Sequence, residues 1–391
     1  MLRFVIAVIA FASAAAAPAQ QPIRIGMLNV VTGQFADAGV QMDNGVKTYL
    51  KMHGDTVGGR RIEIVRRDVG GPLPDVAKRL AQELVVRDKV DILAGFLLTP
   101  NALAVADVSA EAKKLMVIMN AATSIIVTKS PYIVRTSTTI PQVTEAFGAW
   151  AAKSGIRKSY TMVTDYGPGH DAEASFHRSF KENGGEIVGA VRFPVANPDF
   201  SAFVQRAKDL NPESIFVFVP GGAQPASLAK AFADRGIDLR KTKVLGSGET
   251  TAEAALKAMG DTALGMLSAW HYDYKLDNPL NQAFVKEYNA MHGRNPDFFS
   301  VGGYDGMHLI YEALKKTGGK TDGDALVAAA KGMRWDSPRG PMSIDPETRD
   351  VVQTVYIRRV QKVGNEYVNV PFDRVENVRD PAGVRRLKGQ P

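Results

Sequence analysis

Residues 90–124 constrain the fold of this chain more than any other stretch. Val90–Phe96 and Leu115–Met119 are short apolar runs of strand length. Asn101–Lys113, which lies between them, has the apolar spacing of a helix. Strand, helix and strand in this order predict a parallel βαβ unit, because a crossover helix joins parallel neighbours.

A polar elbow follows each strand of this unit, and parallel strands bring both elbows to the same edge of a sheet. Thr99 is expected to be the N-cap of the helix, with Pro100 in the first helical position. The second elbow, Ala121–Thr123, offers small side chains, exposed amides and another hydroxyl. Since a helix N-terminus attracts carboxylates and phosphates, the two elbows together predict an anion site. For Thr99 alone, a plain helix cap is the simpler interpretation.

The same alternation of strand and helix occurs twice along the chain, without a close sequence repeat. In the first series, further strands are expected at Arg24–Leu28, Arg61–Arg67 and Tyr132–Thr136, and helices at Val40–Met52 and Leu73–Val86. In the second series, strands are expected at Tyr160–Asp165, Glu186–Phe193, Ser214–Val219 and Lys243–Gly246, and helices at Pro141–Ser154, Ala172–Glu182, Phe200–Leu210, Pro225–Arg235 and Ala252–Met259. Each series predicts a doubly wound α/β sheet.

The last third of the chain leaves this alternation. Met266–Tyr272 is expected to be a strand that returns toward the first lobe. The expected helices after it are Pro279–Met291, Val301–Lys316 and Gly323–Gly332, and the expected antiparallel strands are Pro341–Ile344, Val352–Gln361 and Glu366–Val370.

The 391 residues are too many for one small core, so we expect two lobes. The expected N-terminal lobe comprises residues 22–140 and 272–344, and the expected C-terminal lobe comprises residues 141–271 and 345–391. Three crossovers are then expected near Thr139-Ile140, Tyr272 and Ile344.

The N-terminus has the form of a secretory signal peptide. A positive start at Arg3 precedes an apolar run, Phe4–Ala17, and Ala17-Pro18-Ala19 has the A-x-A form of a cleavage site. We therefore expect residues 1–19 to be removed and the mature protein to lie in the periplasm. No other stretch is long and apolar enough to span a bilayer, and the absence of cysteine excludes a lipid anchor on a cysteine.

The chain is basic, with a formal net charge of +7 and a pI of about 9.3. Such a balance is found in proteins that bind nucleic acids or anionic membranes. Here the charges are mixed, and no basic stripe is interleaved with aromatic residues. We expect a solvated surface without a nucleic-acid partner. The denser basic end is expected to be a tail, and it contains Arg374, Arg379, Arg385, Arg386 and Lys388.

Residues 90–124 resemble the periplasmic leucine/isoleucine/valine-binding family, the receptors of branched-chain amino acid ABC importers. The match comprises a strand that ends in Gly95, a hydroxyl residue at a helix start, and the elbow Met119–Thr123. In that family the hydroxyl and the elbow hold the carboxylate of the ligand, and Thr99, Ala121 and Thr123 occupy those positions here. The resemblance extends over most of the chain after the leader.

This resemblance implies a type I periplasmic binding protein: an α/β protein of two doubly wound lobes joined by three crossovers. Hinge closure would bury the ligand and present an altered surface to an inner-membrane ABC permease with its ATPases. We expect a monomer that becomes more compact on binding. A sensor of the same fold is an alternative that the sequence leaves open.

If the lobes close on one another, the strand-end elbows should line the pocket. The first lobe is expected to contribute Gln34, Phe35, Thr99, Asn101, Ala121 and Thr123. The second lobe is expected to contribute Tyr166, Gly169, His170, Ala223, Gln224, Gly248 and Glu249. Trp270 and Tyr272 either add an aromatic wall or pack at the hinge. For Asp305, a charge at a helix terminus is the favoured interpretation.

The chain departs from the amino-acid binders of the family it resembles. Those proteins hold the ammonium of the ligand with a carboxylate on a strand-end elbow of the second lobe. In an ungapped comparison Gly248 stands at this place, although a shifted register would bring Glu249 there. We therefore expect a carboxylate without a required α-amino group, and a branched-chain or other amino acid is the alternative.

The expected ligand also has an apolar, aromatic body. Ala38, Gly169 and Ala223 stand near positions where the family has larger aromatic side chains, which leaves room for a ring. Phe35, Tyr166 and Trp270 could stack on that ring.

Sequence signals of catalysis are missing. No G-x-S-x-G elbow or H-E-x-x-H pair occurs, and Gly319-Lys320-Thr321 lacks the first glycine of a phosphate loop, where Leu314 stands. We expect no enzymatic activity, no metal and no cofactor, and an exported α/β enzyme is the less favoured alternative.

Overall fold

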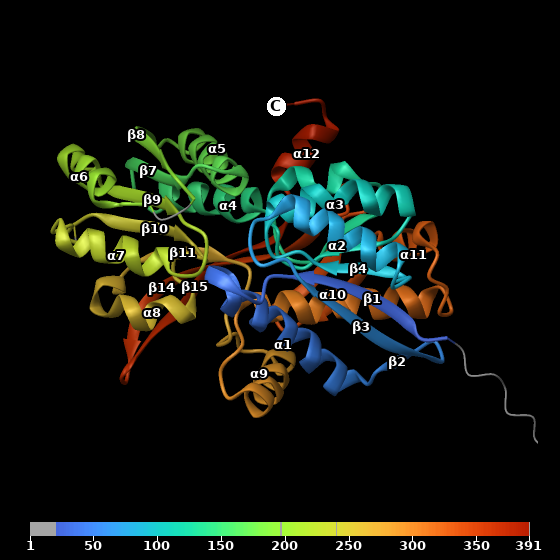
Figure 1. Cartoon of the computed structure of the whole chain (residues 1–391). Coiled ribbons are helices and arrows are strands. Elements are labelled where there is room, and N and C mark those ends of the chain that lie inside the picture. The colour runs from blue at the N-terminus through green and yellow to red at the C-terminus, as the bar shows by residue number, and fades with distance from the viewer. Residues whose placement is uncertain (1–20, 196–197, 240, 391) are drawn as a thin grey trace, which may run out of the picture.

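The computed structural model describes residues 21–195, 198–239 and 241–390. The expected signal peptide, residues 1–19, lies outside the described residues. Two α/β lobes stand side by side, and the chain passes between them more than once (Figure 1).

The first lobe is built on a six-stranded sheet with the strand order β2-β3-β1-β4-β5-β6. All neighbours are parallel except β2 and β3. The strands are β1 (Ile23–Asn29), β2 (Thr56–Val57), β3 (Arg60–Asp68), β4 (Ile92–Gly95), β5 (Met116–Ile118) and β6 (Ile133–Arg135). The helices packed with them are α1 (Ala36–His53), α2 (Pro74–Val86), α3 (Thr99–Ala112), α10 (Phe298–Lys316) and α11 (Gly323–Ala330).

Paired helices cover this sheet: α1 packs with α10, and α2 packs with α3 (Figure 1). Because helices enclose the central strands, every residue of β4 and β5 is buried. Strand β3 has only β2 beyond it and is half-exposed, which agrees with its alternating sequence. Short 3-10 helices follow β1 and β5, at η1 (Gly33–Phe35) and η2 (Ser124–Lys129).

The second lobe is built on a nine-stranded sheet with the order β12-β13-β14-β11-β10-β9-β7-β8, in which β15 also pairs with β14. The strands from β7 to β11 that pair with one another are parallel. The strands are β7 (Lys158–Thr164), β8 (Glu186–Phe193), β9 (Ser214–Phe218), β10 (Lys243–Ser247), β11 (Leu267–Trp270), β12 (Arg334–Ser337), β13 (Gly340–Ile344), β14 (Val351–Val363) and β15 (Glu366–Val378).

Helices also cover both faces of the second sheet. Helix α4 (Ile140–Lys153) packs on α5 (Gly167–Glu182), whereas α7 (Gln224–Asp234) contacts both α6 (Ser201–Leu210) and α8 (Glu253–Met259). The remaining elements are η3 (Gly260–Ala263), α9 (Pro279–His292), which contacts α1, and α12 (Pro381–Leu387), which contacts α4 and η2.

The predicted fold of two doubly wound α/β lobes is confirmed, and several element boundaries are corrected. Helix α10 begins at Phe298, three residues before the expected start, because Asp297 and Ser300 form a capping box. The strand expected to return toward the first lobe is β11, and it stays in the second sheet, where it pairs with β10 and β14. Its buried apolar residues fit a central position in that sheet.

The residue ranges assigned to each lobe stay a prediction. The strand pairing disagrees with these ranges in one place. Strands β12 and β13 fall in the range 272–344, which was assigned to the N-terminal lobe, but they extend the second sheet through β14. Helices α10 and α11 of the same range pack on strands of the first sheet.

The basic C-terminal end is not a free tail. It forms α12, whose Arg385 pairs with Glu145 on α4 at 2.5 Å. Arg386 donates to the carbonyl oxygen of Ser124 at 3.1 Å, and Arg379 donates to Glu347 at 2.8 Å. A charge count along the sequence missed these ion pairs because their acidic partners lie far away in the chain.

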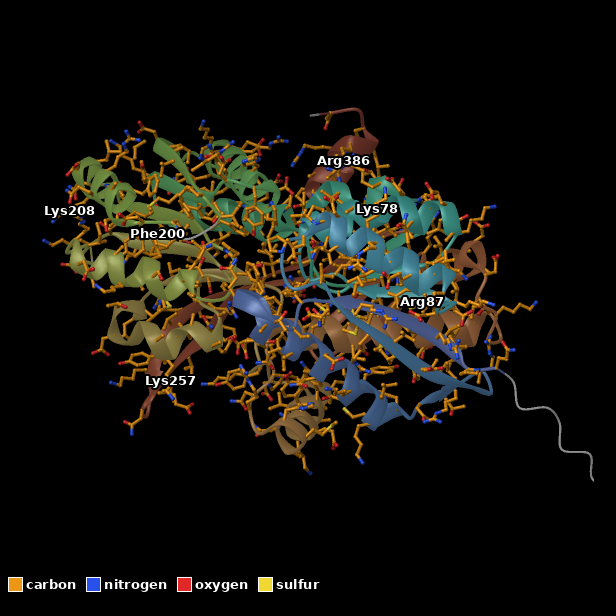
Figure 2. All side chains as sticks on the ribbon, viewed as in Figure 1. Lys78, Arg87, Phe200, Lys208, Lys257 and Arg386 are labelled. Carbon is orange, nitrogen blue, oxygen red and sulfur yellow. The ribbon has the colours of Figure 1, made fainter. Side chains whose placement is uncertain are left out.

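Elsewhere the charged side chains spread over both lobes. Figure 2 labels examples of these charged side chains. Lys78 on α2 and Arg87 at its end belong to the first lobe, and Lys208 on α6 and Lys257 on α8 belong to the second. This distribution agrees with a solvated surface. In the part of the chain that the structure describes, no helix has the length and apolar character needed to cross a membrane.

A buried ion pair joins the segments that connect the lobes. Arg339, between β12 and β13, donates from Nε to Asp305 on α10 at 2.8 Å, and neither side chain is exposed. The same guanidinium donates to the carbonyl oxygen of Ser137 at 2.8 Å and to Gln353 on β14 at 2.9 Å. Asp305 therefore belongs to this connection and does not act as a helix-terminal charge.

Replacing Arg339 with Ala should destabilise the protein by about 3–5 kcal/mol, because Asp305 would stay buried without its cation. Denaturant unfolding measures the change. The matched control is Arg61→Ala, which removes an exposed ion pair with Asp55 and should cost at most about 1 kcal/mol. Equal losses in the two variants would contradict the assignment.

Candidate ligand-binding site

A small cavity, partly open to solvent, lies between the strand-end elbows of the two lobes. Most of its lining follows the carboxyl ends of parallel strands, where open α/β sheets bind ligands. The lining residues are Phe35, Ala38, Leu97, Leu98, Thr99, Ala121, Ala122, Tyr166, Pro168, Pro220, Gly221, Glu249 and Phe299.

The first lobe presents the hydroxyl of Thr99 to this site, and the hydroxyl of Thr123 lies next to it. Oγ1 of Thr99 and Oγ1 of Thr123 are 3.1 Å apart, and both side chains are buried. Thr99 is the first residue of α3, so its amide and the amide of Asn101 have no acceptor within the helix. A ligand carboxylate can therefore accept hydrogen bonds from the helix start and from a hydroxyl.

Two details of the predicted anion site are wrong. The N-cap of α3 is Leu98, which makes no side-chain cap bond, and the hydroxyl of Thr99 contacts Thr123. The amide of Ala121 is not exposed, since it donates to the carbonyl oxygen of Phe96 at 2.9 Å. That bond extends the pairing of β4 and β5 beyond the strand ends.

The second lobe presents a buried carboxylate. Glu249, which follows β10, is 8% exposed, and its Oε2 accepts a hydrogen bond from the amide of Gly221 at 2.7 Å. Burial raises the pKa of Glu249 to about 7, and the Gly221 amide opposes this rise. Burial and the nearby Glu249 raise the pKa of Tyr166 well above 10.

Gly248 does not face the cavity. A Cβ at this position would lie 2.0 Å from Cγ of Trp270, so the indole occupies the space beside the Gly248 backbone. Glu249 is therefore the carboxylate on the elbow, and the missing clamp inferred from Gly248 no longer argues against an amine in the ligand. Trp270 itself is 1% exposed and packs edge-on against Phe298 at 5.1 Å.

Aromatic side chains surround the space between these two ends. Phe35 and Phe299 are each 7% exposed, and Phe299 lies 4.0 Å from Phe298 between ring centroids. The ring of Tyr166 is partly buried and lies 6.3 Å from the ring of Phe218. Together these rings make a lining suited to an apolar or aromatic body.

Several predicted site residues lie outside this cavity. The side chain of Asn101 donates to the carbonyl oxygen of Gly71 at 2.9 Å and holds a neighbouring loop. His170 is exposed and pairs with Asp165 at 2.6 Å. At Gly169 a Cβ would lie 1.8 Å from the carbonyl oxygen of Thr164, so this glycine allows α5 to pack against the end of β7.

Tyr272, expected at the hinge or as an aromatic wall, donates to Asn281 at 2.8 Å away from the cavity. Gln34, Ala223 and Gln224 line a second space that shares Phe35 and Gly221 with the first. Ligand binding by any of the predicted residues stays a prediction.

Sequence reasoning missed part of the lining. Phe299 comes from the first turn of α10, and the only signal for it was the cap sequence Pro296-Asp297 before an aromatic pair. Pro220 and Gly221 directly follow the expected strand Ser214–Val219, but nothing in the sequence indicated that the Gly221 amide would bind Glu249. The other residues missed were Leu97, Leu98, Ala122 and Pro168.

Direct contacts join the elbows of the two lobes. Ser124, next to the hydroxyl pair, donates its amide to Asp171 on α5 at 2.9 Å. A Cβ on Gly167 would lie 3.0 Å from Oγ1 of Thr123, and a Cβ on Gly222 would lie 3.1 Å from the carbonyl oxygen of Gln34. The structure therefore has the lobes closed on each other around the cavity.

Two α/β lobes that close over a cavity at their strand ends define a protein that binds a small solute. The chain matches the model of the periplasmic binding protein family over residues 22–365 and belongs to that family. It is 43% identical over 375 residues to the Leu/Ile/Val-binding protein homolog 6 of Brucella melitensis, an alignment that covers 95% of this chain and 96% of the relative.

Solved structures of ABC-transporter solute-binding proteins have the same fold. One from Rhodopseudomonas palustris, in complex with 3,4-dihydroxybenzoic acid, is 50% identical with a TM-score of 0.89. Another from R. palustris, in complex with 4-hydroxybenzoate, is 41% identical with a TM-score of 0.90. Each comparison covers 92% of this chain and 99% of the other. A leucine-binding protein of Thermotoga maritima, at 22% identity and a TM-score of 0.81, shares the fold.

Within residues 21–195, 198–239 and 241–390, no three or more His, Cys, Asp or Glu side chains are grouped so that they could hold a metal ion.

Replacing Thr99 with Ala should lower ligand affinity by about tenfold or more, because a hydrogen bond to a charged group contributes about 1.5–3 kcal/mol. Isothermal titration calorimetry measures the affinity, and thermal unfolding should show little loss of stability. Thr99→Ser, which keeps the hydroxyl, is the control and should bind nearly as well as the parent protein. Unchanged affinity in Thr99→Ala would leave Thr99 a structural residue.

Glu249 should make stability depend on pH. Because burial raises its pKa to about 7, the folded state binds the proton more tightly than the unfolded state. Stability from this group is complete below its unfolded pKa and is lost as pH rises through about 7. Gln cannot ionise, so Glu249→Gln should match the parent near pH 5 and exceed it by about 1–3 kcal/mol at pH 8.

Denaturant unfolding of the ligand-free proteins between pH 5 and pH 8 tests this expectation. Burial also raises the pKa values of Asp273, Asp297 and Asp350 to about 7. These carboxyls are present in both proteins and cancel in the difference. A difference in stability that does not change with pH would contradict the burial of an ionisable Glu249.

Proposed function

We propose that this protein binds a small aromatic carboxylate in the periplasm and delivers it to an inner-membrane ABC permease. One observation carries the proposal: the cavity joins the hydroxyl and helix start at Thr99 to aromatic walls formed by Phe35, Tyr166 and Phe299. The helix start and hydroxyls suit a carboxylate, and the aromatic walls suit a ring.

The comparisons support an aromatic ligand. Relatives at 41% and 50% identity were solved with hydroxylated benzoic acids. A third structure, from R. palustris HaA2 with p-hydroxybenzoic acid, is 41% identical with a TM-score of 0.89. Identity at this level over nearly the whole chain favours a ligand of the same chemical class.

Hinge closure is the proposed mode of binding. The contact of Ser124 with Asp171 and the close approach of Gly167 to Thr123 can form only when the two lobes are together. The segments between the lobes, tied by Arg339 and Asp305, would be the pivot. Small-angle scattering should show a more compact monomer when ligand is present.

A branched-chain amino acid is the second candidate. It is favoured by the carboxylate of Glu249 on the cavity, which could pair with an ammonium, and by the name of the Brucella relative. No reaction is proposed, because the family and fold are those of solute-binding proteins and the cavity combines an anion site with apolar walls.

A thermal-shift panel separates the two candidates. The panel comprises leucine, valine, phenylalanine, benzoate, hydroxybenzoates, cinnamates and phenylpyruvate. A ligand at a hundredfold excess over its Kd stabilises the folded protein by about 2.7 kcal/mol, which raises the melting temperature measurably. We expect aromatic acids without an amine to raise it and leucine and valine to leave it unchanged. The reverse pattern would replace the proposed function with amino-acid binding.

A further inference from the structure

Among the described residues that line the cavity, Glu249 is the only charged one. It belongs to the second lobe, whereas Thr99 and Ala121 line the cavity from the first lobe. A ligand whose carboxylate binds at Thr99 therefore points its other end toward the second-lobe elbows. The chemical group at the end of the ligand remote from its carboxylate should therefore decide how tightly the ligand binds.

The carboxylate of Glu249 has acceptor capacity left over. In the part of the chain that the structure describes, its hydrogen-bond donor is the Gly221 amide, which contacts Oε2, whereas a carboxylate has about four lone-pair positions. Among the described residues, no cationic side chain forms an ion pair with it, and burial is the main influence on its ionisation. A buried acceptor in this condition gains from any donor that the ligand can supply.

The walls of the cavity restrict the kind of donor. Phe35, Phe299 and the ring of Tyr166 are suited to a flat apolar body, so the donor must sit on the edge of a ring. A hydroxyl on the ring supplies one hydrogen-bond donor and adds no charge. An unsubstituted ring would instead place apolar C–H groups against Glu249 and leave the remaining lone pairs of its carboxylate desolvated and without a donor.

We propose that Glu249 accepts a hydrogen bond from a ring hydroxyl remote from the ligand's carboxylate, and that it thereby selects hydroxybenzoates over benzoates without a hydroxyl. This inference rests on the proposed function, since it assumes an aromatic carboxylate in the cavity. A site built to bond a hydroxyl rejects an analogue without it far more strongly than an apolar pocket can reject an extra methylene.

Gly248 and Trp270 fix the position of this acceptor. The indole of Trp270 fills the space beside the Gly248 backbone and so restricts the position of the elbow. The Gly221 amide holds the side chain of Glu249 through a hydrogen bond. A fixed acceptor discriminates between donor positions on the ring. A hydroxyl adjacent to the ligand's carboxylate, as in 2-hydroxybenzoate, points away from the second lobe and should gain nothing.

The test measures the Kd values of 4-hydroxybenzoate and 4-fluorobenzoate by calorimetry. Fluorine is close in size to a hydroxyl and donates no hydrogen bond, so the ratio of the two Kd values reports the donor alone. The parent protein should prefer 4-hydroxybenzoate by about tenfold or more. In Glu249→Gln, the amide oxygen retains the Gly221 bond and the amide nitrogen replaces the acceptor, so the ratio should fall to about threefold or less.

Asp165→Asn is the matched control, because it also removes one negative charge from a second-lobe elbow. Asp165 pairs with the exposed His170, and its side chain is 58% exposed. This variant should keep the ratio of the parent protein. Because each ratio compares two ligands on the same variant, a general loss of affinity or stability cancels.

The outcomes separate this inference from the function on which it rests. If both benzoates bind the parent protein with equal affinity, or if Glu249→Gln keeps the parent's ratio, the role of Glu249 is wrong and aromatic-acid binding stands. If neither benzoate binds and leucine does, the proposed function fails and this inference fails with it.

Discussion

Parallel strands end at the same edge of their sheet, and the architecture of this protein depends on that constraint. In each lobe the chain leaves the carboxyl edge through an elbow that starts a helix, so helix amides, hydroxyls and small side chains collect there without any sequence motif. Two such edges face each other across the cavity. The first supplies Thr99, whose hydroxyl contacts Thr123, and the second supplies Glu249, so the site is polar at its ends and apolar between them.

This constraint explains what could be predicted from the sequence. Apolar periodicity predicted nearly all the strands and helices and the two doubly wound lobes, and Thr99, Ala121, Tyr166 and Glu249 were expected where the cavity is found. Periodicity could not predict which residue of an elbow faces inward. Gly248 and Glu249 differ by one position, and the choice between them depends on an indole 22 residues later in the chain, beside which only glycine fits.

The same limit applies to polar residues whose partners are distant in the sequence. Asn101, at the start of α3, is turned toward Gly71 and away from the cavity. The basic end of the chain was expected to be a tail, but α12 is anchored by Glu145, and Arg386 reaches Ser124 beside the hydroxyl pair. Such contacts are set by packing between lobes, which composition and spacing do not report. They connect the C-terminus to the elbow that we expect to hold the ligand's carboxylate.

A buried carboxylate is costly unless a partner compensates for the loss of water. In Arg339 and Asp305 the partner is a cation of the same chain, and the pair holds the connecting segments together. Glu249 has the Gly221 amide and no cation among the described residues. In the proposed hinge closure, the lobes would remove water from Glu249, so a ligand that supplies a donor would lower the free energy of the closed state relative to the open state. The residue that costs stability in the empty closed form is thus the one through which the correct ligand favours closure.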